Sequence, residues 1–565
     1  MSGLKSMDEQ IDPISLEILW NRLIGVANEQ AAALMRTSFT SVVRESGDLS
    51  AAVFDARGRM LAQAVTGTPG HINSLATSMK HFLAAFPVAE LSPGDVLITN
   101  DPWKTSGQLN DFSVVTPVFH RKGLIGFLGN TCHAVDIGGR GLSADASEVF
   151  EEGLFVPMSK LYEQGRPNQL LLAIIAANVR APAEVLGDLN AQVVGNDVGA
   201  NRLVKYLDEF ELADLEVLSD EILDRSERAV RQAITAVPDG DYTSVVHTDG
   251  IDQPIRIQCA IRIRGDEIAV DYAGSSEQVP QGMNVVLNYT AAYTNYGLKC
   301  AICPEVPHNE GSFRPVTITA PAGSILNPRF PAAVAARHIV GQFLPDAVFG
   351  ALAEVLPQRI IAPGSGNIWL VTIRGSGQDR FTSVIFAAGG MGARPTADGL
   401  SATSFPSGIA TTPVEVLESN APLLVRRKVL RRDSGGPGKY RGGLGQEIAI
   451  EVRTREAFVV SALADRIKSA APGRAGGLPG ARGGFLIAGR PRSAKISASL
   501  PPGTGFTLQL PGGGGFGKPD GREPERIAED IAEGLVSARE AAATYGFRPA
   551  RRRVSARRVQ GRRYL

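Results

Sequence analysis

A small set of acidic and imidazole side chains in this sequence has the chemistry of a metal site or of proton transfer. Asp111 and His133 stand 22 positions apart, and a carboxylate with an imidazole suits zinc, manganese or iron. That spacing alone does not bring the two side chains together. His71 follows a Gly-Thr-Pro-Gly turn, and a histidine with a pKa near ~6.5 could act as a general acid or base. The alternative is a surface histidine beside a helix N-cap.

Two further patterns have both a chemical and a structural interpretation. Cys300 and Cys303 form a C-x-x-C pair, but no second pair completes a zinc ribbon, and their apolar flanks favour packed free thiols. Gly512–Gly515 could cradle a phosphate with backbone N–H groups. The run leads to Lys518-Pro519 and not straight into a helix, so tight turns are the favoured interpretation. The loop RDSGGPGKYRGGLG allows the same two interpretations.

Helix and strand signals must position these residues, and they occur in blocks without steady βαβ alternation. Asp12 and Pro13 suit an N-cap and a first helical position, and apolar residues at helical spacing predict a helix towards Met35. Further helices are predicted over about 168–215 with a break near Pro182, over 220–237, over 331–357 and, as one amphipathic helix, over Pro524–Tyr545. Strands are predicted at 49–54, 96–99, 113–119, 124–129, 255–263, 267–272 and 447–452. The mixture predicts an α+β fold.

The length of 565 residues suggests two to four domains, at roughly 150 residues each. We expect a large multi-domain protein of mixed sheets and helices. The predicted parts are an N-terminal α+β domain over 1–240, a central mixed α/β region over 241–420 and a Gly-rich β and loop region over 421–547. The tail, 548–565, holds eight Arg and no acid. Such a segment has little to bury, so we expect it to be disordered.

Composition narrows the possible partners and location. Lys and Arg (58) balance Asp and Glu (58), so no overall field attracts nucleic acid or a membrane surface. We find no apolar run of about 18 residues that would predict a membrane span. The four cysteines favour a reducing compartment, and MSGLKSMDEQIDP lacks the apolar core of a signal peptide. These features predict a cytoplasmic protein without nucleic-acid or membrane partners.

Three stretches of sequence, in order along the chain, carry a family pattern. The first is NDPWKTSGQLNDFSVVTPVF, followed by HAVDIGG from His133. The second is PEVPHNEGSFRPVTITAPAGSILNPRFPAAVAAR, which ends at Arg337. The third joins RRDSGGPGKYRGGLGQE with LPGGGGFGKPDGREPERIAEDIAEGLVS. The chain resembles B-type subunits of the hydantoinase B/oxoprolinase family, which are related to the acetone carboxylase alpha subunit and usually read NDPY-x-GGTHLPD and then HHADIGG.

The resemblance implies a function that needs a second protein. In such families an A-type subunit uses ATP to activate a lactam, hydantoin or ketone, and the B-type subunit helps complete hydrolysis or carboxylation. This chain lacks a G-x-x-x-x-G-K-[ST] loop, which agrees with ATP binding by the partner. We therefore expect a hetero-oligomeric hydrolase that opens a cyclic amide such as a hydantoin, 5-oxoproline or a lactam.

The resemblance also implies a divalent metal site. Asp111 and His133 match family ligands, and an earlier family Asp matches Asp48. The sequence departs from the pattern where the family His of GGTHL becomes Gln108 and the second His of HHADIGG becomes Ala134. A neutral amide is a weaker ligand than imidazole for transition metals, so the predicted set of Asp48, Gln108, Asp111 and His133 is either retuned or has lost its metal.

Three more residues are predicted to have catalytic roles. His71 matches a family His and would supply a proton to the leaving nitrogen. Asp101 and Asp136 lie in the two motif loops, where each could orient a ligand histidine or simply close an Asx-turn.

Two other functions stay open on the sequence alone. One is an acetone-carboxylase-like subunit in which the metal would stabilise an enolate-like intermediate. The other is a non-catalytic assembly subunit whose altered site, with Gln108 and Ala134, no longer binds a metal.

Overall fold

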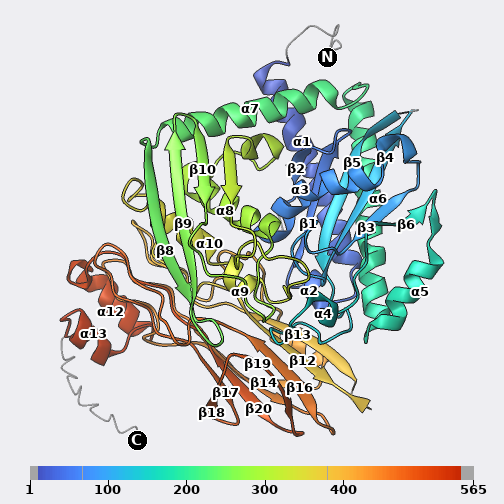
Figure 1. Ribbon diagram of the computed structural model, residues 1–565. Helices are drawn as coiled ribbons and strands as arrows, with labels where there is room; N and C mark the ends of the chain where they lie inside the picture. The colour runs from blue at the N-terminus through green and yellow to red at the C-terminus, as the bar shows by residue number, and fades with distance from the viewer. Residues whose placement is uncertain (1–10, 66–67, 122, 378–379, 549–565) are drawn as a thin grey trace, which may run out of the picture.

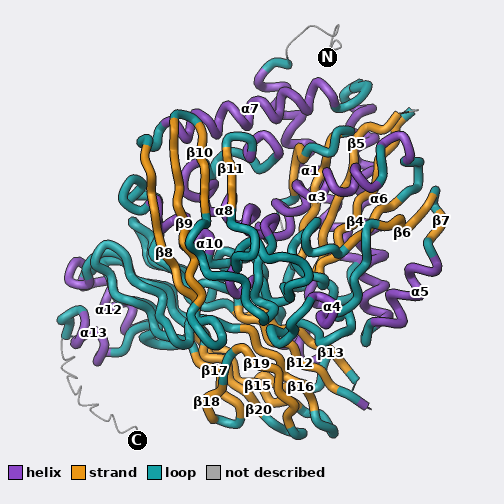
Figure 2. Tube along the Cα trace, in the orientation of Figure 1, coloured by secondary structure: helices purple, strands orange, loops and turns teal. Residues whose placement is uncertain are grey.

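The structure is a computed structural model that describes residues 11–65, 68–121, 123–377 and 380–548. Three sheet-containing regions surround a centre rich in loops (Figures 1 and 2). The predicted basic tail lies outside the described residues except for Arg548. The α+β prediction is confirmed, because four separate sheets combine with helices that do not alternate regularly with the strands.

The first region is a seven-stranded sheet with helices on both faces. Its order is β2-β1-β5-β4-β3-β6-β7. The strands are β1 (Leu49–Asp55), β2 (Met60–Gln63), β3 (Val96–Thr99), β4 (Asp111–His120), β5 (Gly123–His133), β6 (Ser159–Glu163) and β7 (Arg166–Pro167). Alternate β1 residues pack to opposite sides: Val53 belongs to the core under α1 (Pro13–Thr37) and α6 (Pro182–Glu209), and Phe54 to the core under α3 (Pro69–Ala85). Both faces of the sheet are therefore covered by apolar side chains.

Local sequence signals explain the first helix. The Asp12 carboxylate accepts hydrogen bonds from the backbone N–H groups of Ile14 and Ser15, which fulfils the predicted N-cap. The predicted break near Pro182 is also confirmed, because α5 (Gln169–Asn178) ends before it and α6 begins there. Further helices are α2 (Ser41–Arg44), α4 (Val149–Glu152), α7 (Glu216–Thr235), α9 (His338–Gly341) and α11 (Val414–Asn420).

The second region is a four-stranded sheet in the order β11-β10-β9-β8. It contains β8 (Gly240–Thr248), β9 (Ile255–Arg264), β10 (Glu267–Asp271) and β11 (Val316–Thr319), with β11 parallel to β10. Alternate residues of β9 are buried, as expected for a sheet with one covered face. Helices α8 (Leu287–Ile302) and α10 (Leu344–Leu352) connect this sheet to α3 and the first region.

The third region is a pair of sheets joined by one apolar core. One has the order β13-β12-β16-β19 and the other β14-β15-β20-β17-β18. The strands are β12 (Trp369–Gly375), β13 (Phe381–Ala387), β14 (Leu423–Leu430), β15 (Gln446–Val452), β16 (Phe458–Leu463), β17 (Gly484–Ile487), β18 (Arg490–Arg492), β19 (Lys495–Leu500) and β20 (Gly505–Gln509). Because β12 pairs with β16, one sheet contains strands from both sides of position 420, where the sequence predicts a domain boundary. The predicted domain boundaries stay predictions.

Two helix predictions are wrong in their extent. Residues 331–337 form turns ahead of α9 and α10. Backbone N–H groups of this segment donate hydrogen bonds to Glu152, which is far away in the sequence, and these bonds hold the turns in place. The helix predicted over Pro524–Tyr545 is two helices, α12 (Pro524–Ala532) and α13 (Ala538–Thr544). Gly534 between them has φ of 75°, a conformation that favours glycine and ends a right-handed helix.

No helix in the described ranges is long and apolar enough to cross a membrane. The C-x-x-C cysteines are free thiols, and burial raises the pKa of both. Gly512 and its neighbours pack closely against other backbone, for a Cβ at Gly512 would lie 1.8 Å from the Ser434 carbonyl oxygen. Close backbone packing therefore accounts for this glycine run.

Candidate active site

Strand pairing and one helix start bring the predicted residues together. Asp111 begins β4 and His133 ends β5, and the two are direct cross-strand partners. Asp48 immediately precedes β1, and its carbonyl oxygen accepts the backbone N–H of His133. His71 lies in the first turn of α3, where the Thr68 hydroxyl caps its backbone N–H. These elements are buried and packed on both sides, so the four side chains are fixed by a rigid frame.

The Asp111 carboxylate is the centre of the arrangement. His133 Nδ1 lies 3.0 Å from Asp111 Oδ1, and His71 Nε2 lies 3.1 Å from Asp111 Oδ2. Asp48 is close to both rings, at 3.5 Å from His71 Nδ1 and 3.9 Å from His133 Nδ1. The prediction that Asp48, Asp111 and His133 converge is therefore fulfilled in the structure, and His71 joins them. All four side chains are buried.

Three more donors complete the environment of Asp111. Gln108 Nε2 donates to Oδ1 at 2.7 Å, while the Ser106 hydroxyl donates to Oδ2 at 2.6 Å. Arg337 Nη2 donates to Oδ2 at 2.6 Å, and Arg337 Nε donates to the Ser106 carbonyl oxygen. We call Asp48, His71, Gln108, Asp111, His133 and Arg337 the carboxylate–imidazole cluster.

The electrostatics of the cluster follow from burial and from these contacts. Burial alone would raise the pKa of Asp111, but His71, Arg337 and the hydrogen bonds outweigh it and hold that pKa well below 3.8. Burial alone would lower the pKa of His71, but the Asp111 and Asp48 carboxylates outweigh it and raise that pKa above 6.5. The structure therefore favours an ionised Asp111 beside a charged His71.

The cluster borders a narrow cavity of about 30 Å³, room for a water molecule or two. Tyr289 packs its ring 4.1 Å from the Arg337 guanidinium carbon, a cation–π contact that fixes the arginine. His338 also lines the cavity; burial, followed by the charge of Arg337, lowers its pKa to about 3. Gly107 permits this packing, because it has φ of 91° and a Cβ there would lie 2.8 Å from Arg337 Cδ.

Arg337, Tyr289 and His338 were not identified as site residues from the sequence. Arg337 lies 226 positions from Asp111, so no local spacing connects them. The available signal was that Arg337 ends the second family-like stretch. A charged residue inside the apolar run PAAVAARHIV also needs a buried partner.

The predicted metal ligands are close together, but they do not form a metal-binding arrangement. Across the described part of the chain, no three or more His, Cys, Asp or Glu side chains are placed to hold an ion. Gln108 donates through its amide nitrogen to Asp111 Oδ1, and the same nitrogen lies 3.0 Å from His133 Nδ1. An amide nitrogen is a hydrogen-bond donor and not a metal ligand. Arg337 also supplies a positive charge to Asp111.

Asp101 and Asp136 lie apart from the cluster. The Asp101 carboxylate accepts the Trp103 backbone N–H at 3.0 Å and pairs with Lys104, which is the Asx-turn alternative. Asp136 pairs with Arg180 at 2.7 Å. Within the described ranges, neither carboxylate makes a hydrogen bond or ion pair with a cluster residue. Their catalytic roles remain predictions that the geometry does not favour.

Comparison with known proteins agrees with the sequence pattern. The profile of the hydantoinase B/oxoprolinase family matches residues 12–519. A Pseudomonas sp. (strain NS671) protein, provisionally named as the B component of a D-/L-hydantoinase, is 32% identical, with 97% of each chain covered. The beta chain of the Pseudomonas jessenii caprolactamase is 30% identical, with 95% of this chain and 96% of the relative covered.

Solved structures have the same fold. The ATP-dependent caprolactamase from Pseudomonas jessenii superimposes with a TM-score of 0.86 at 28% identity, covering 96% of this chain and 97% of that one. Acetone carboxylase superimposes with a TM-score of 0.85 at 20% identity, covering 95% of this chain and 80% of that one, and that likeness concerns the fold alone. The chain belongs to the hydantoinase B/oxoprolinase family.

Proposed function

We propose that this chain is the B-type subunit of an ATP-dependent hydrolase that opens a cyclic amide. The substrate class comprises hydantoins, 5-oxoproline and lactams. Family membership and relatives named as hydantoinase, caprolactamase and 5-oxoprolinase support the reaction type. The observation that carries the proposal is the buried Asp111 carboxylate, shared by two histidines at 3.1 and 3.0 Å.

A separate A-type subunit would supply ATP-dependent activation of the substrate. The 5-oxoprolinase 1 of Arabidopsis thaliana matches 91% of this chain, but the match occupies only 42% of that relative. More than half of the longer protein therefore has no counterpart in this chain. We infer that a partner subunit provides that missing part, and we place the complex in the cytoplasm.

The two histidines have different surroundings and can divide the proton transfers. In the tautomer that carries its proton on Nδ1, His133 donates to Asp111 Oδ1 and keeps the lone pair on Nε2, which has no hydrogen-bond partner in the described structure. His133 can therefore accept a proton from the attacking water. His71 donates through Nε2 to Asp111 Oδ2, and its Nδ1 has no hydrogen-bond partner there. A proton on that nitrogen can pass to the leaving amide nitrogen as the C–N bond breaks.

A divalent metal was predicted at Asp48, Gln108, Asp111 and His133, as zinc, manganese or iron. In their present arrangement these side chains do not fit such an ion. The Gln108 amide nitrogen and the Arg337 guanidinium donate hydrogen bonds to the two Asp111 oxygens that would have to bind it. We therefore assign no step to a metal.

The proposal is tested by reconstituting the two-subunit enzyme. Co-expression with the A-type subunit should give one joint peak in size-exclusion chromatography. Incubation with ATP should then open at least one of hydantoin, 5-oxoproline and caprolactam, detected as the ring-opened acid together with ADP. Asp111→Asn is the matched variant, since it keeps the size of the side chain and removes its charge.

Each alternative function has its own result. Consumption of bicarbonate with a ketone, without ring opening of any amide, would favour the carboxylase. A stable complex whose turnover is unchanged in Asp111→Asn would show that the cluster is not catalytic. Two separate chromatographic peaks at low and high salt would contradict the partner assignment.

A further inference from the structure

A second and larger cavity lies between the first region of the fold and the sheet that contains β12 and β13. Its volume is about 560 Å³, within the size range of small-ligand sites. One wall consists of Phe39–Val42 and Arg180–Glu184 from the first region. The other consists of Gly375 and Arg380–Val384. We call it the entrance cavity.

The entrance cavity adjoins the carboxylate–imidazole cluster along β13 and beyond the end of β5. On β13, Val384 lines the entrance cavity and Phe386 lines the cluster cavity. Residues two apart in a strand share one face and lie about 6–7 Å apart along it. Just past the end of β5 the two cavities are also close in the chain, because His133 borders the cluster cavity and Val135 borders the entrance cavity.

The walls of the entrance cavity carry positive charge that is only partly neutralised. Arg44 pairs with Glu45 and Arg180 pairs with Asp136. Arg380 lines the cavity and makes no hydrogen bond or ion pair within the described residues. The acidic residue Glu184 also lines the cavity.

Arg374 adds a further guanidinium beside the entrance cavity. It precedes the lining residue Gly375 and shares a face of β12 with Leu370, which borders the cluster cavity. Its side chain reaches Gly141 of the first region. Burial, followed by the nearby charge of Arg180, lowers the pKa of Arg374. The described residues offer it no hydrogen bond or ion pair, although the charges of Asp136 and Asp145 act on it from nearby. Arg374 and Arg380 are therefore two arginines beside the cavity that have no directly paired carboxylate in the described part of the chain.

We propose that the entrance cavity is the path by which substrate reaches the cluster, and that Arg374 and Arg380 bind a negatively charged group of that substrate. This rests on the proposed function and narrows its substrate class to anionic molecules. The group is a carboxylate carried by the cyclic amide itself or a phosphoryl group added by the ATP-dependent partner. Both are planar or tetrahedral oxyanions that a guanidinium binds through paired N–H donors.

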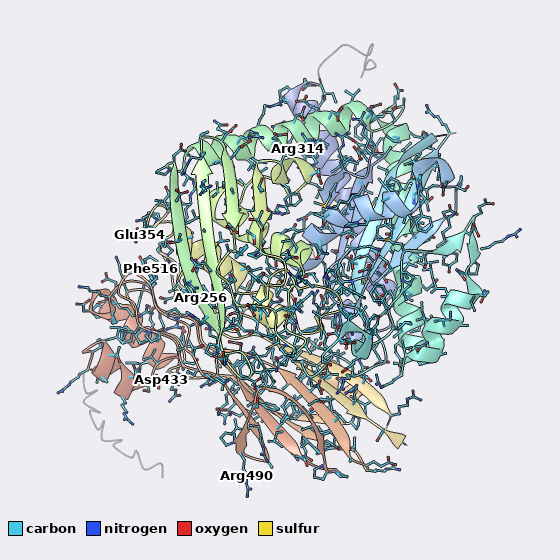
Figure 3. All side chains as sticks on the ribbon, in the orientation of Figure 1. Arg256, Arg314, Glu354, Asp433, Arg490 and Phe516 are labelled. Atoms are coloured by element: carbon cyan, nitrogen blue, oxygen red, sulfur yellow. The ribbon has the colours of Figure 1, made fainter. Side chains whose placement is uncertain are left out.

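Binding to the isolated chain tests the proposal without partner, ATP or turnover. Isothermal titration calorimetry would use inorganic phosphate, 5-oxoproline and the uncharged lactam 2-pyrrolidinone as probes. Arg374→Gln and Arg380→Gln should each weaken anion binding about tenfold or more, the scale of one lost charge-assisted hydrogen bond. Arg490→Gln is the control, because Arg490 is not among the residues that line the entrance cavity. Figure 3 shows Arg490 at the outer end of the C-terminal sheets.

The probes separate the two sources of the anion. Phosphate binding that depends on Arg374 and Arg380 indicates a phosphoryl group, while 5-oxoproline binding with that dependence indicates a carboxylate. The proposal is overturned if neither phosphate nor 5-oxoproline binds in a way that depends on Arg374 and Arg380, or if the control variant weakens anion binding as much as the two variants. If the reconstituted enzyme turns over amides but both substitutions leave anion binding unchanged, only the role of the entrance cavity is refuted. Arginine-dependent binding without any turnover would refute only the proposed function.

Discussion

Glu152 offers a sharp test of how the turn before Arg337 is held. Its Oε1 accepts the backbone N–H groups of Val334 and Ala335 at 2.6 and 2.7 Å. Its Oε2 is buried without a hydrogen-bond partner among the described atoms. Burial raises the pKa of Glu152 from 4.5 to about 8, so the neutral acid is the form that the fold accommodates.

The perturbation is Glu152→Gln, which keeps the shape and the accepting oxygen but cannot ionise. Because the folded pKa lies above the unfolded one, the stabilisation from wild-type Glu152 is complete below pH 4.5 and is lost as pH rises to 8. Each pH unit between these values removes about 1.36 kcal/mol, which gives a total of about 5 kcal/mol. Between pH 4.5 and pH 8, the free energy of unfolding of the wild type should therefore fall by about 5 kcal/mol relative to that of the variant.

The assay is urea denaturation of both proteins at several pH values between 4.5 and 8.5, with hydrogen exchange of residues 331–337 as the local measurement. Glu151→Gln is the control, since the neighbouring Glu151 pairs with Arg140 at the surface and its pKa is lowered, not raised. Parallel pH profiles for wild type and Glu152→Gln would refute the assignment. So would a relative stability of the wild type that rises with pH.

Three further outcomes are expected. Gln108→His should increase the zinc retained after dialysis, because imidazole replaces an amide nitrogen beside Asp111. Elemental analysis of the wild type, this variant and His133→Ala measures the bound zinc, and equal zinc contents in all three would contradict the prediction. Asp111→Asn should cost roughly 3–5 kcal/mol in urea denaturation, the scale of breaking a buried ion pair, and should abolish most turnover; a loss below about 1 kcal/mol, typical of a surface pair, would show that the pairing is weak. Deleting Arg548–Leu565 should leave the thermal midpoint almost unchanged, and a drop of many degrees would show that the tail is docked.

Local structure was predictable where the determining interactions are themselves local. Asp12 caps the first helix within three residues, and Pro182 starts α6 because its ring suits a first helical position. The helix predicted over 331–357 contains α9 and α10, but its start was predicted wrongly because the segment is largely apolar. A segment buried on all sides has no periodic polar face to distinguish a helix from packed turns, and hydrogen bonds to Glu152 decide its shape.

The site was predictable only as far as the family resemblance reached. Residue types alone could not pair Asp111 with His133, because strand register sets that contact. The resemblance supplied them, along with Asp48 and His71, but gave no geometry. It therefore could not show that Asp101 closes a turn or that Asp136 pairs with Arg180.

Gln108 shows why geometry changes the meaning of a departure from a family pattern. From sequence, an amide at a ligand position suggested a weakened metal site. In the structure its nitrogen donates to Asp111 Oδ1, while Arg337 donates to Oδ2. A buried carboxylate needs its lone pairs satisfied and its charge compensated, and these two side chains do both. A divalent ion entering here would have to displace Arg337 or turn Gln108 away. Metal binding and the present hydrogen-bond arrangement are therefore competing states of one site. Because of this competition, the metal content of Gln108→His is more informative than that of the wild type alone.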